Sequence, residues 1–304
     1  MFNLTTFIPL TRRAATGLCL SVLFCSAVTA HEAEHEHADL TPRVVSAGAG
    51  ITELIFALGA EDELVAVDST SQLPTADKDI AKLGYHRMLS AEGILALSPS
   101  MVIGSDAMGP KTTLEVLSAA DVNVVQLPSA NSQSQLFSNI DKMGKLLHKE
   151  AQASALKSKL TQSFLDIETK KQQIASKGNT PTILFLLLQP DRPARVGGDN
   201  TAADIIIKLA GGKNIAGFSG YKSVSQEGIL ALDPDVILIS SRSGNHAVDP
   251  VSTLLKDMPL LAHTSAGKHK QIQNLKPQAL LGGLGISAIA EANSLASDLI
   301  KVKY

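Results

Sequence analysis

The sequence has little cysteine and little net charge. Both cysteines, Cys19 and Cys25, come early in a chain of 304 residues, so the remainder has no thiol for a disulfide or for thiolate chemistry. The 27 Lys and Arg residues nearly balance the 29 Asp and Glu residues, and no basic run is present. We therefore expect no nucleic-acid partner. With 44% hydrophobic residues, the chain can bury one large core or two medium ones.

The sequence also lacks the motifs of common enzymes. No nucleophile–base pair, metal-catalyst motif or phosphate loop is present, so we expect no catalytic activity. Gly48 and Gly50 match the first two glycines of G-x-G-x-x-G, and Asp68 follows the next predicted strand. The third glycine is replaced by Glu53, whose bulk and charge oppose a pyrophosphate. A nicotinamide-dependent oxidoreductase is therefore only an alternative.

The first forty residues do not read as part of the fold. Arg12 and Arg13 precede an apolar stretch from Ala14 to Val28 that is too short to span a bilayer, and small residues end it at Ala30. We predict a signal peptide over 1–30 and export to the periplasm. A leader over 31–40 follows, in which His31, His35 and His37 lie among carboxylates. It is interpreted as solvated, with divalent-ion scavenging as the alternative.

One phrase occurs twice in the chain. Aligned from Ser90 and Ser225, nine of sixteen residues are identical, including Ser-x-Glu-Gly-Ile-Leu-Ala-Leu and a later proline. Each copy follows a Gly-Tyr pair and runs from a capped helical segment through proline into an apolar, β-branched run, which is one step of a parallel α/β sheet. Two copies predict two lobes.

The segment between the two copies predicts the connection. From 135 to 176 apolar residues recur mostly three to five positions apart, with no proline and one glycine, which predicts a helix about 60 Å long. The predicted fold is α/β: a first lobe over 41–134, a long interlobe helix over 135–176, and a second lobe over 177–304. Each lobe is expected to be doubly wound around a parallel sheet, and the helical connection to limit lobe movement.

These features together carry a family resemblance. The signal peptide, the lobes joined by one helix, and above all Leu83-Gly84-Tyr85-His86-Arg87-Met88-Leu89-Ser90-Ala91-Glu92-Gly93 resemble the periplasmic haem-binding proteins of bacterial haem-uptake ABC transporters. The general part is shared with siderophore- and cobalamin-binding relatives of the class III periplasmic binding protein fold. The resemblance implies a carrier that takes haem b to an inner-membrane permease, and we expect it to be a monomer.

The resemblance implies that Tyr85 is the axial ligand of the haem iron and that Arg87 supports it. A phenolate is a hard anionic oxygen suited to ferric iron, and a guanidinium can stabilise it by a hydrogen bond. In an extended loop, residues i and i+2 share a face, so we expect Tyr85 and Arg87 to point together and His86 away. His86 is the second choice of ligand. The alternative is that Tyr85 is an ordinary aromatic residue of the cleft wall without a role in iron binding.

The opposite wall of the site is expected from the second lobe. Tyr221 and Lys222 stand nearly where Tyr85 and His86 stand in the first copy. The predicted haem contacts there are Tyr221 and Lys222, with Arg192, Arg195 or Arg242 pairing with the propionates. The stretch from Gln189 to Asn200 is predicted to be a loop. Some haem binders of this family place a histidine there, and its absence here predicts one haem and one protein ligand.

The two repeats also align a pair of carboxylates, Glu92 and Glu227. In similar binding proteins, glutamates at these places dock against arginines of a dimeric permease, which implies the same role here. The alternative is that each glutamate only stabilises its own helix. Two further ligand classes stay open. A siderophore or corrinoid binder would share the fold without needing Tyr85, and a zinc or manganese carrier would use the leader histidines with His86.

Overall fold

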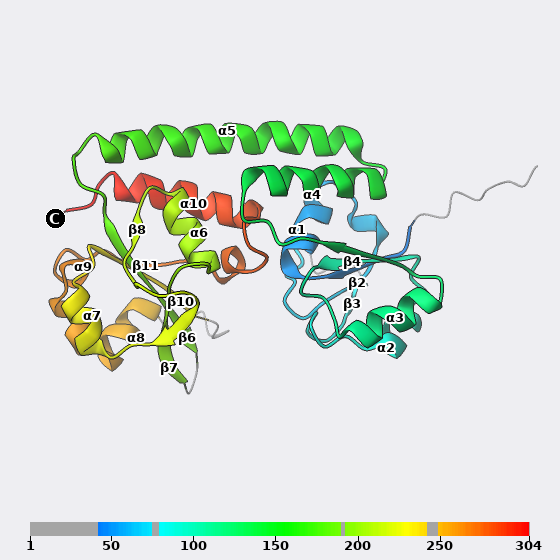
Figure 1. The fold of residues 1–304 in the computed structure, drawn as a ribbon, viewed down its shortest axis with the longest axis horizontal. Coiled ribbons are helices and arrows are strands. Elements are labelled where there is room, and N and C mark those ends of the chain that lie inside the picture. Colours follow the sequence, from blue (N-terminus) through cyan, green and yellow to red (C-terminus); the bar gives the residue numbers. More distant parts are fainter. Residues whose placement is uncertain (1–41, 75–78, 190–191, 242–248, 304) are drawn as a thin grey trace, which may run out of the picture. The chain divides into compact units, whose positions relative to one another are not determined.

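The computed structural model describes residues 42–74, 79–189, 192–241 and 249–303 (Figure 1). The predicted signal peptide over 1–30, the leader over 31–40 and Arg242 lie outside these ranges. No helix among the described residues is long and apolar enough to cross a membrane.

The first lobe is built on a sheet of five parallel strands in the order β3-β2-β1-β4-β5. Its central strand β1 is buried along its whole length because helices cover both faces of the sheet. This agrees with the predicted doubly wound lobe. In chain order its elements are β1 (Val44–Ala47), α1 (Ala49–Ala57), η1 (Glu61–Glu63), β2 (Leu64–Val67), β3 (Ala81–Lys82), α2 (Ala91–Leu95), β4 (Met101–Ser105), α3 (Lys111–Ala119), β5 (Asn123–Leu127) and α4 (Gln133–Leu146).

The second lobe has a mixed sheet in the order β11-β10-β6-β7-β9, with β8 also paired to β6. Strands β8, β10 and β11 run parallel to β6, as predicted. Strand β7 is the exception, because it pairs antiparallel with β6 on one side and with β9 on the other. Its elements are β6 (Thr182–Gln189), β7 (Arg192–Gly197), α6 (Ala202–Leu209), β8 (Lys213–Asn214), β9 (Tyr221–Ser223), α7 (Gln226–Leu232), β10 (Val236–Ser241), α8 (Pro250–Asp257), η2 (Pro259–His263), α9 (Ser265–Lys268), β11 (Ile272–Asn274), η3 (Pro277–Leu280) and α10 (Ile286–Leu299).

The predicted loop from Gln189 to Asn200 is wrong, because half of it forms β7. Its prolines and glycines favoured a loop, but β7 lies beside β6 and can tolerate proline at its outer end. Its inner end is buried, and Gly197 pairs with Phe185. A Cβ on Gly197 would lie 2.8 Å from the Phe185 ring, so glycine permits this close pairing.

Both copies of the repeat form the element order that was predicted. Ser90 caps α2 and Ser225 caps α7, each hydroxyl accepting a hydrogen bond from the backbone N–H three residues on. The apolar runs that follow are β4 and β10, which are inner strands of their sheets. The duplicated phrase is therefore a helix–strand step in each lobe.

The predicted single helix over 135–176 is wrong in its extent. The segment forms two helices, α4 and α5 (Glu150–Ala175), which lie side by side as an αα-hairpin (Figure 1). The chain reverses at His148, which has a left-handed φ of 52°. Apolar periodicity continues on both sides of this link, so the pattern alone concealed it. Helix α5 carries the chain from the first lobe to the second and spans roughly 39 Å.

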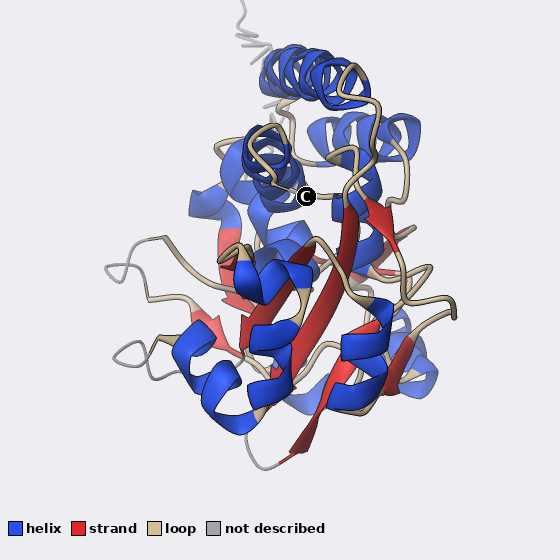
Figure 2. Cartoon of the chain, turned by 90° about the vertical axis from the view of Figure 1, so that its left-hand side faces the viewer, coloured by secondary structure: helices blue, strands red, loops and turns tan. Residues whose placement is uncertain are grey.

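One hydrophobic core runs through both lobes along the layer of α4, α5 and α10. It joins buried residues of the first lobe, such as Ile55 and Ile140, to residues of the second lobe, such as Phe185 and Ile289. Two smaller cores fill the opposite faces of the sheets, around Val102 and around Ile237. Figure 2 shows strands of the second lobe running between helices.

Candidate ligand-binding site

Tyr85 lies on a turn that is anchored at both ends. The Met88 N–H donates to the Tyr85 carbonyl at 2.7 Å, which closes the turn. Before the turn, the Ser69 N–H donates to the Gly84 carbonyl, and after it, the Leu89 N–H donates to the Gly109 carbonyl. The Tyr85 side chain is 44% exposed, which is unusual for a large aromatic in a well-anchored segment.

The expected extended loop is therefore wrong, and with it the prediction that His86 points away from Tyr85. The i and i+2 rule applies only to extended backbone, and this segment is a turn. Tyr85, His86 and Arg87 all line one cavity. The structure thus brings together the three residues that the sequence proposed for this wall.

The cavity has a volume of about 310 Å³ and is lined by both lobes. The first lobe contributes the Tyr85 turn, the start of α1 and the ends of β4 and β5. The second lobe contributes Leu280 to Gly285, the loop before α10. The lining combines a phenol, an imidazole and a guanidinium with apolar side chains such as Ile51, Leu127 and Leu136. Such a lining suits a largely apolar ligand that carries a Lewis-acidic centre and anionic groups.

His86 is held by a buried aspartate. Its Nδ1 lies 3.0 Å from Oδ2 of Asp68, whose side chain has no exposed surface. The His86 ring also lies beside the Tyr85 ring, with centroids 4.4 Å apart and planes at 58°. Burial alone would raise the pKa of Asp68, but hydrogen bonds from His86, Ser71 and Thr70 outweigh it and lower this pKa to about 2. Asp68 is therefore ionised at neutral pH.

The predicted contacts of the second lobe gather elsewhere, on β7 and β9. The Arg195 guanidinium lies 5.5 Å from the centre of the Tyr221 ring and donates to the Tyr221 carbonyl. The Lys222 ammonium lies 4.9 Å from the centre of the Phe218 ring. Arg192 is exposed at the outer end of β7. None of these four residues lines the cavity of Tyr85, and Arg242 lies outside the described residues.

Glu92 and Glu227 occupy equivalent positions. Each is exposed and is the second residue after the serine cap of its helix, where the helix dipole favours a carboxylate. Hydrogen bonds from its own backbone N–H and from Ser225 lower the pKa of Glu227. The alternative of local helix stabilisation therefore has a physical basis. Neither glutamate lines the cavity of Tyr85, so both are available to a partner.

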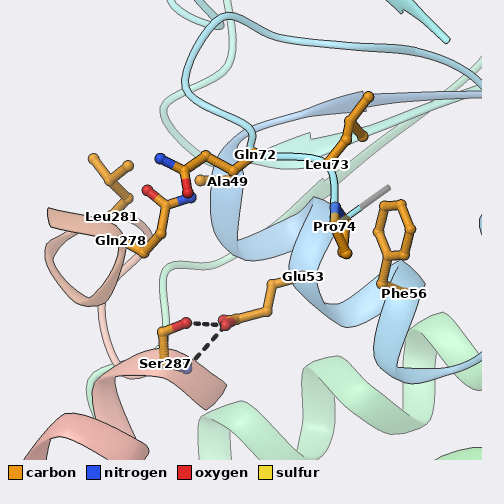
Figure 3. A pocket seen from close by; sticks show the side chains of 9 residues that line it. All are labelled: Ala49, Glu53, Phe56, Gln72, Leu73, Pro74, Gln278, Leu281 and Ser287. Carbon is orange, nitrogen blue, oxygen red and sulfur yellow. Dashed lines mark hydrogen bonds between the residues drawn. The ribbon is translucent and has the colours of Figure 1, made fainter. Parts of the chain in front are cut away.

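A direct link between the lobes lies near the cavity and involves Glu53. This α1 carboxylate accepts hydrogen bonds from the backbone N–H of Ser287, at 3.0 Å, and from its hydroxyl, at the start of α10 (Figure 3). The loop before α10 also forms a β-bridge between Gly283 and Ala130 and passes close to Gly50. Glu53 thus caps a helix of the other lobe.

Sequence reasoning missed Asp68 and Glu53 as parts of the site. Both were weighed only against a dinucleotide motif, and the structure gives each another role. The link between Asp68 and His86 had a usable signal, since they follow β2 and β3, which are neighbouring parallel strands whose carboxyl ends meet. The link between Glu53 and Ser287, 234 residues apart, had none. No group of three or more His, Cys, Asp or Glu residues poised to bind a metal occurs within the part of the chain that the structure describes.

The fold and the cavity between the lobes define a binding protein of two α/β lobes joined by a helix. The chain belongs to the periplasmic binding protein family, whose model matches residues 44–279. This membership favours a binding protein over the alternative of a nicotinamide-dependent oxidoreductase.

Particular relatives narrow the comparison. The periplasmic haem-binding protein HutB of Vibrio cholerae is 38% identical with a TM-score of 0.77, and the match covers 85% of this chain and 99% of that one. The periplasmic haem-binding protein BhuT, solved in complex with two haems, is 31% identical with a TM-score of 0.73, covering 86% and 98%. The vitamin B12-binding protein of Yersinia pestis (strain Pestoides F) is 27% identical over 242 residues, which is 79% of each protein.

Proposed function

We propose that this chain is the periplasmic substrate-binding component of an ABC importer and that its ligand is ferric haem, transported as haem b. The observation that carries the proposal is Tyr85, an exposed phenol on an anchored turn at the cavity between the lobes, which Arg87 also lines. Two solved relatives above 30% identity are named as haem-binding proteins, which supports the same ligand.

The chemistry of the cavity fits this ligand. Bringing a phenol with a pKa near 10 to its anion at pH 7 costs about 4 kcal/mol. A ferric ion supplies most of this through coordination, and the cationic Arg87 on the same wall lowers the remaining cost. Apolar side chains around the turn bury the porphyrin faces. The protein binds and hands over the haem without changing it, so the proposed role is not enzymatic.

The proposed stoichiometry is one haem per monomer. Residues 189–200 contain no histidine to serve a second iron. A relative solved with two haems makes the number worth measuring. Under the proposal, Tyr85 is the axial ligand of the haem iron and Arg87 stabilises its phenolate. His86 contacts the haem without binding the iron. Tyr221, Lys222, Arg192, Arg195 and Arg242 remain proposed contacts of the second lobe.

A corrinoid is the second candidate ligand, because one curated relative is a vitamin B12-binding protein. A corrinoid brings its own axial ligand to the metal, so it does not need Tyr85. The chain departs from that relative at nearly three quarters of the matched positions. The Tyr85 turn therefore favours haem, and a siderophore ligand is disfavoured for the same reason.

The test is a pair of titrations of the protein purified from the periplasm, one with hemin and one with cyanocobalamin. The proposal predicts saturation at one hemin per chain, a charge-transfer band typical of high-spin ferric phenolate, and no competition by excess cyanocobalamin. Binding of cyanocobalamin without hemin would move the ligand class to corrinoids. If the protein binds neither compound, both candidate ligands are refuted, while its membership of the family still holds.

Delivery to the permease is the second half of the proposal. Glu92 and Glu227 are exposed on separate lobes at equivalent positions, which suits two matching sites on a permease dimer. Release follows when these contacts change the spacing of the lobes. Glu53 and the bridge between Ala130 and Gly283 resist large changes, so we propose small lobe movements.

A further inference from the structure

Asp68 lies where three segments of the cavity wall meet. Oδ1 accepts hydrogen bonds from the Gly48 N–H at 3.1 Å and the Ser71 hydroxyl at 2.7 Å. Oδ2 accepts from the N–H and hydroxyl of Thr70, at 3.2 and 2.7 Å, and lies 3.0 Å from His86 Nδ1. This buried carboxylate therefore joins the start of α1, the segment after β2 and the Tyr85 turn.

The contact with His86 fixes the chemistry of that ring. An ionised carboxylate only accepts hydrogen bonds, so the proton must be on Nδ1. In the neutral ring, Nε2 is then the unprotonated nitrogen. The ring can neither flip nor change tautomer without losing this bond, and it is only 14% exposed. His86 is thus a rigid neighbour for the exposed Tyr85 ring, which lies 4.4 Å away.

We propose that Asp68 is a positioning residue: through His86 it holds the Tyr85 turn in the geometry that binds the ligand iron. The inference rests on the proposed function and adds a residue that acts without touching the ligand. An exposed tyrosine has several rotamers, and each rotamer that misses the iron lowers the affinity. By fixing the His86 ring beside Tyr85, the Asp68 carboxylate restricts the rotamers that Tyr85 can adopt.

The geometry makes Asp68→Asn an informative substitution. Each Asp68 oxygen accepts from one backbone N–H, Gly48 on Oδ1 and Thr70 on Oδ2. An asparagine amide must place its NH₂ group against one of these donors, whichever way it turns. His86→Phe complements it, because it keeps a ring beside Tyr85, removes Nδ1 and leaves the other bonds of Asp68 in place.

The experiment measures hemin affinity for the wild type, Asp68→Asn, His86→Phe and the double variant. Ser71→Ala is the matched control, because it removes a donor from Oδ1, the oxygen that does not hold His86. We expect each single change to weaken binding by about 10-fold or more, in the range typical of residues that support a metal ligand. The double variant should bind hemin no more weakly than the single variant that has the lower affinity. Ser71→Ala should stay within about 3-fold of the wild type.

A second readout needs no hemin. Long-range ¹H–¹⁵N spectra of the histidine rings in the ligand-free protein should show His86 protonated on Nδ1, and a mixture of tautomers in Asp68→Asn. Additive losses in the double variant, or an equal loss in Ser71→Ala, would overturn the positioning role. If Asp68→Asn fails to fold, an unchanged hemin affinity in His86→Phe is enough by itself to overturn the positioning role. A wild type that binds no hemin would refute the proposed function, while the spectra would still show whether Asp68 holds His86.

Discussion

The two copies of the repeated phrase place their tyrosines in opposite environments. Tyr85 is exposed on a turn and lines the cavity between the lobes. Tyr221 is half-buried at the start of β9, pairs with Gly197 of β7 and lies under the Arg195 guanidinium. One sequence pattern thus yields a cavity-lining tyrosine in one lobe and a tyrosine of a paired strand in the other. The backbone decides between them, because a turn exposes the ring and a paired strand holds it.

The glutamates of the same two copies behave alike where the tyrosines differ. Both follow a serine cap and both are exposed. We therefore predict the largest effect for Glu92→Ala combined with Glu227→Ala: haem uptake by cells is abolished, while hemin affinity changes less than about 2-fold. Removing two steering charges from a transient interface weakens its formation most. The measurement is uptake by a strain that depends on this protein, beside a hemin titration.

The single variants are the control for that result. Glu92→Ala and Glu227→Ala should each reduce haem uptake only partly, and by similar amounts. Normal transport by the double variant would refute docking and support local helix stabilisation. A loss from one glutamate only would show that the permease does not use the two lobes alike.

Acid should lower the stability of the protein through Asp68, which holds His86 of the Tyr85 turn. Its pKa is lowered from 3.8 to about 2 in the folded chain, so the unfolded chain takes up the proton first as the pH falls. The stabilisation is fully present above about pH 4 and is lost as the pH falls towards 2, with a size of about 2 kcal/mol. Urea unfolding at pH 6, 4 and 2.5 should show this loss in the wild type and a smaller one in Asp68→Asn. Equal losses in both proteins would contradict the role of this carboxylate.

The glycines before the two tyrosines give the smallest and cleanest contrast. Gly220 has a φ of 75°, in the left-handed region, whereas Gly84 does not, and an added Cβ at Gly84 meets only the Met88 carbonyl at 3.9 Å. We predict that Gly220→Ala lowers the free energy of unfolding by about 1 kcal/mol and that Gly84→Ala changes it by less than about 0.5 kcal/mol. Denaturant unfolding checks both, and a reversed order would refute the backbone account of the two copies.

These contrasts also show which features the sequence could predict. Patterns within a short window were reliable: Ser90 and Ser225 cap helices, and apolar runs after them form strands. The hairpin at His148 was missed because neither glycine nor proline marks it and the apolar period continues through it. β7 was missed because prolines and glycines favour loops unless a neighbouring strand supplies pairing.

The candidate site was predictable in part for the same reason. Tyr85, His86 and Arg87 are consecutive, so the motif brought them together without knowledge of the fold. The loop from Leu280 to Gly285 reaches the same cavity only through the packing of α10, and Glu53 meets Ser287 only in the folded chain. Such contacts depend on the arrangement of the lobes, which local patterns do not specify.

The most direct test of the account compares the two tyrosines in one hemin titration. Tyr85→Phe and Tyr221→Phe each remove one oxygen and keep the ring, so packing is nearly unchanged. We predict that Tyr85→Phe loses the ferric phenolate band and about 100-fold or more in hemin affinity, since the change removes the iron ligand itself. Tyr221→Phe should keep the band and stay within about 3-fold of the wild type. An unchanged spectrum in Tyr85→Phe, or loss of the band in Tyr221→Phe, would contradict the assignment of Tyr85 as the iron ligand.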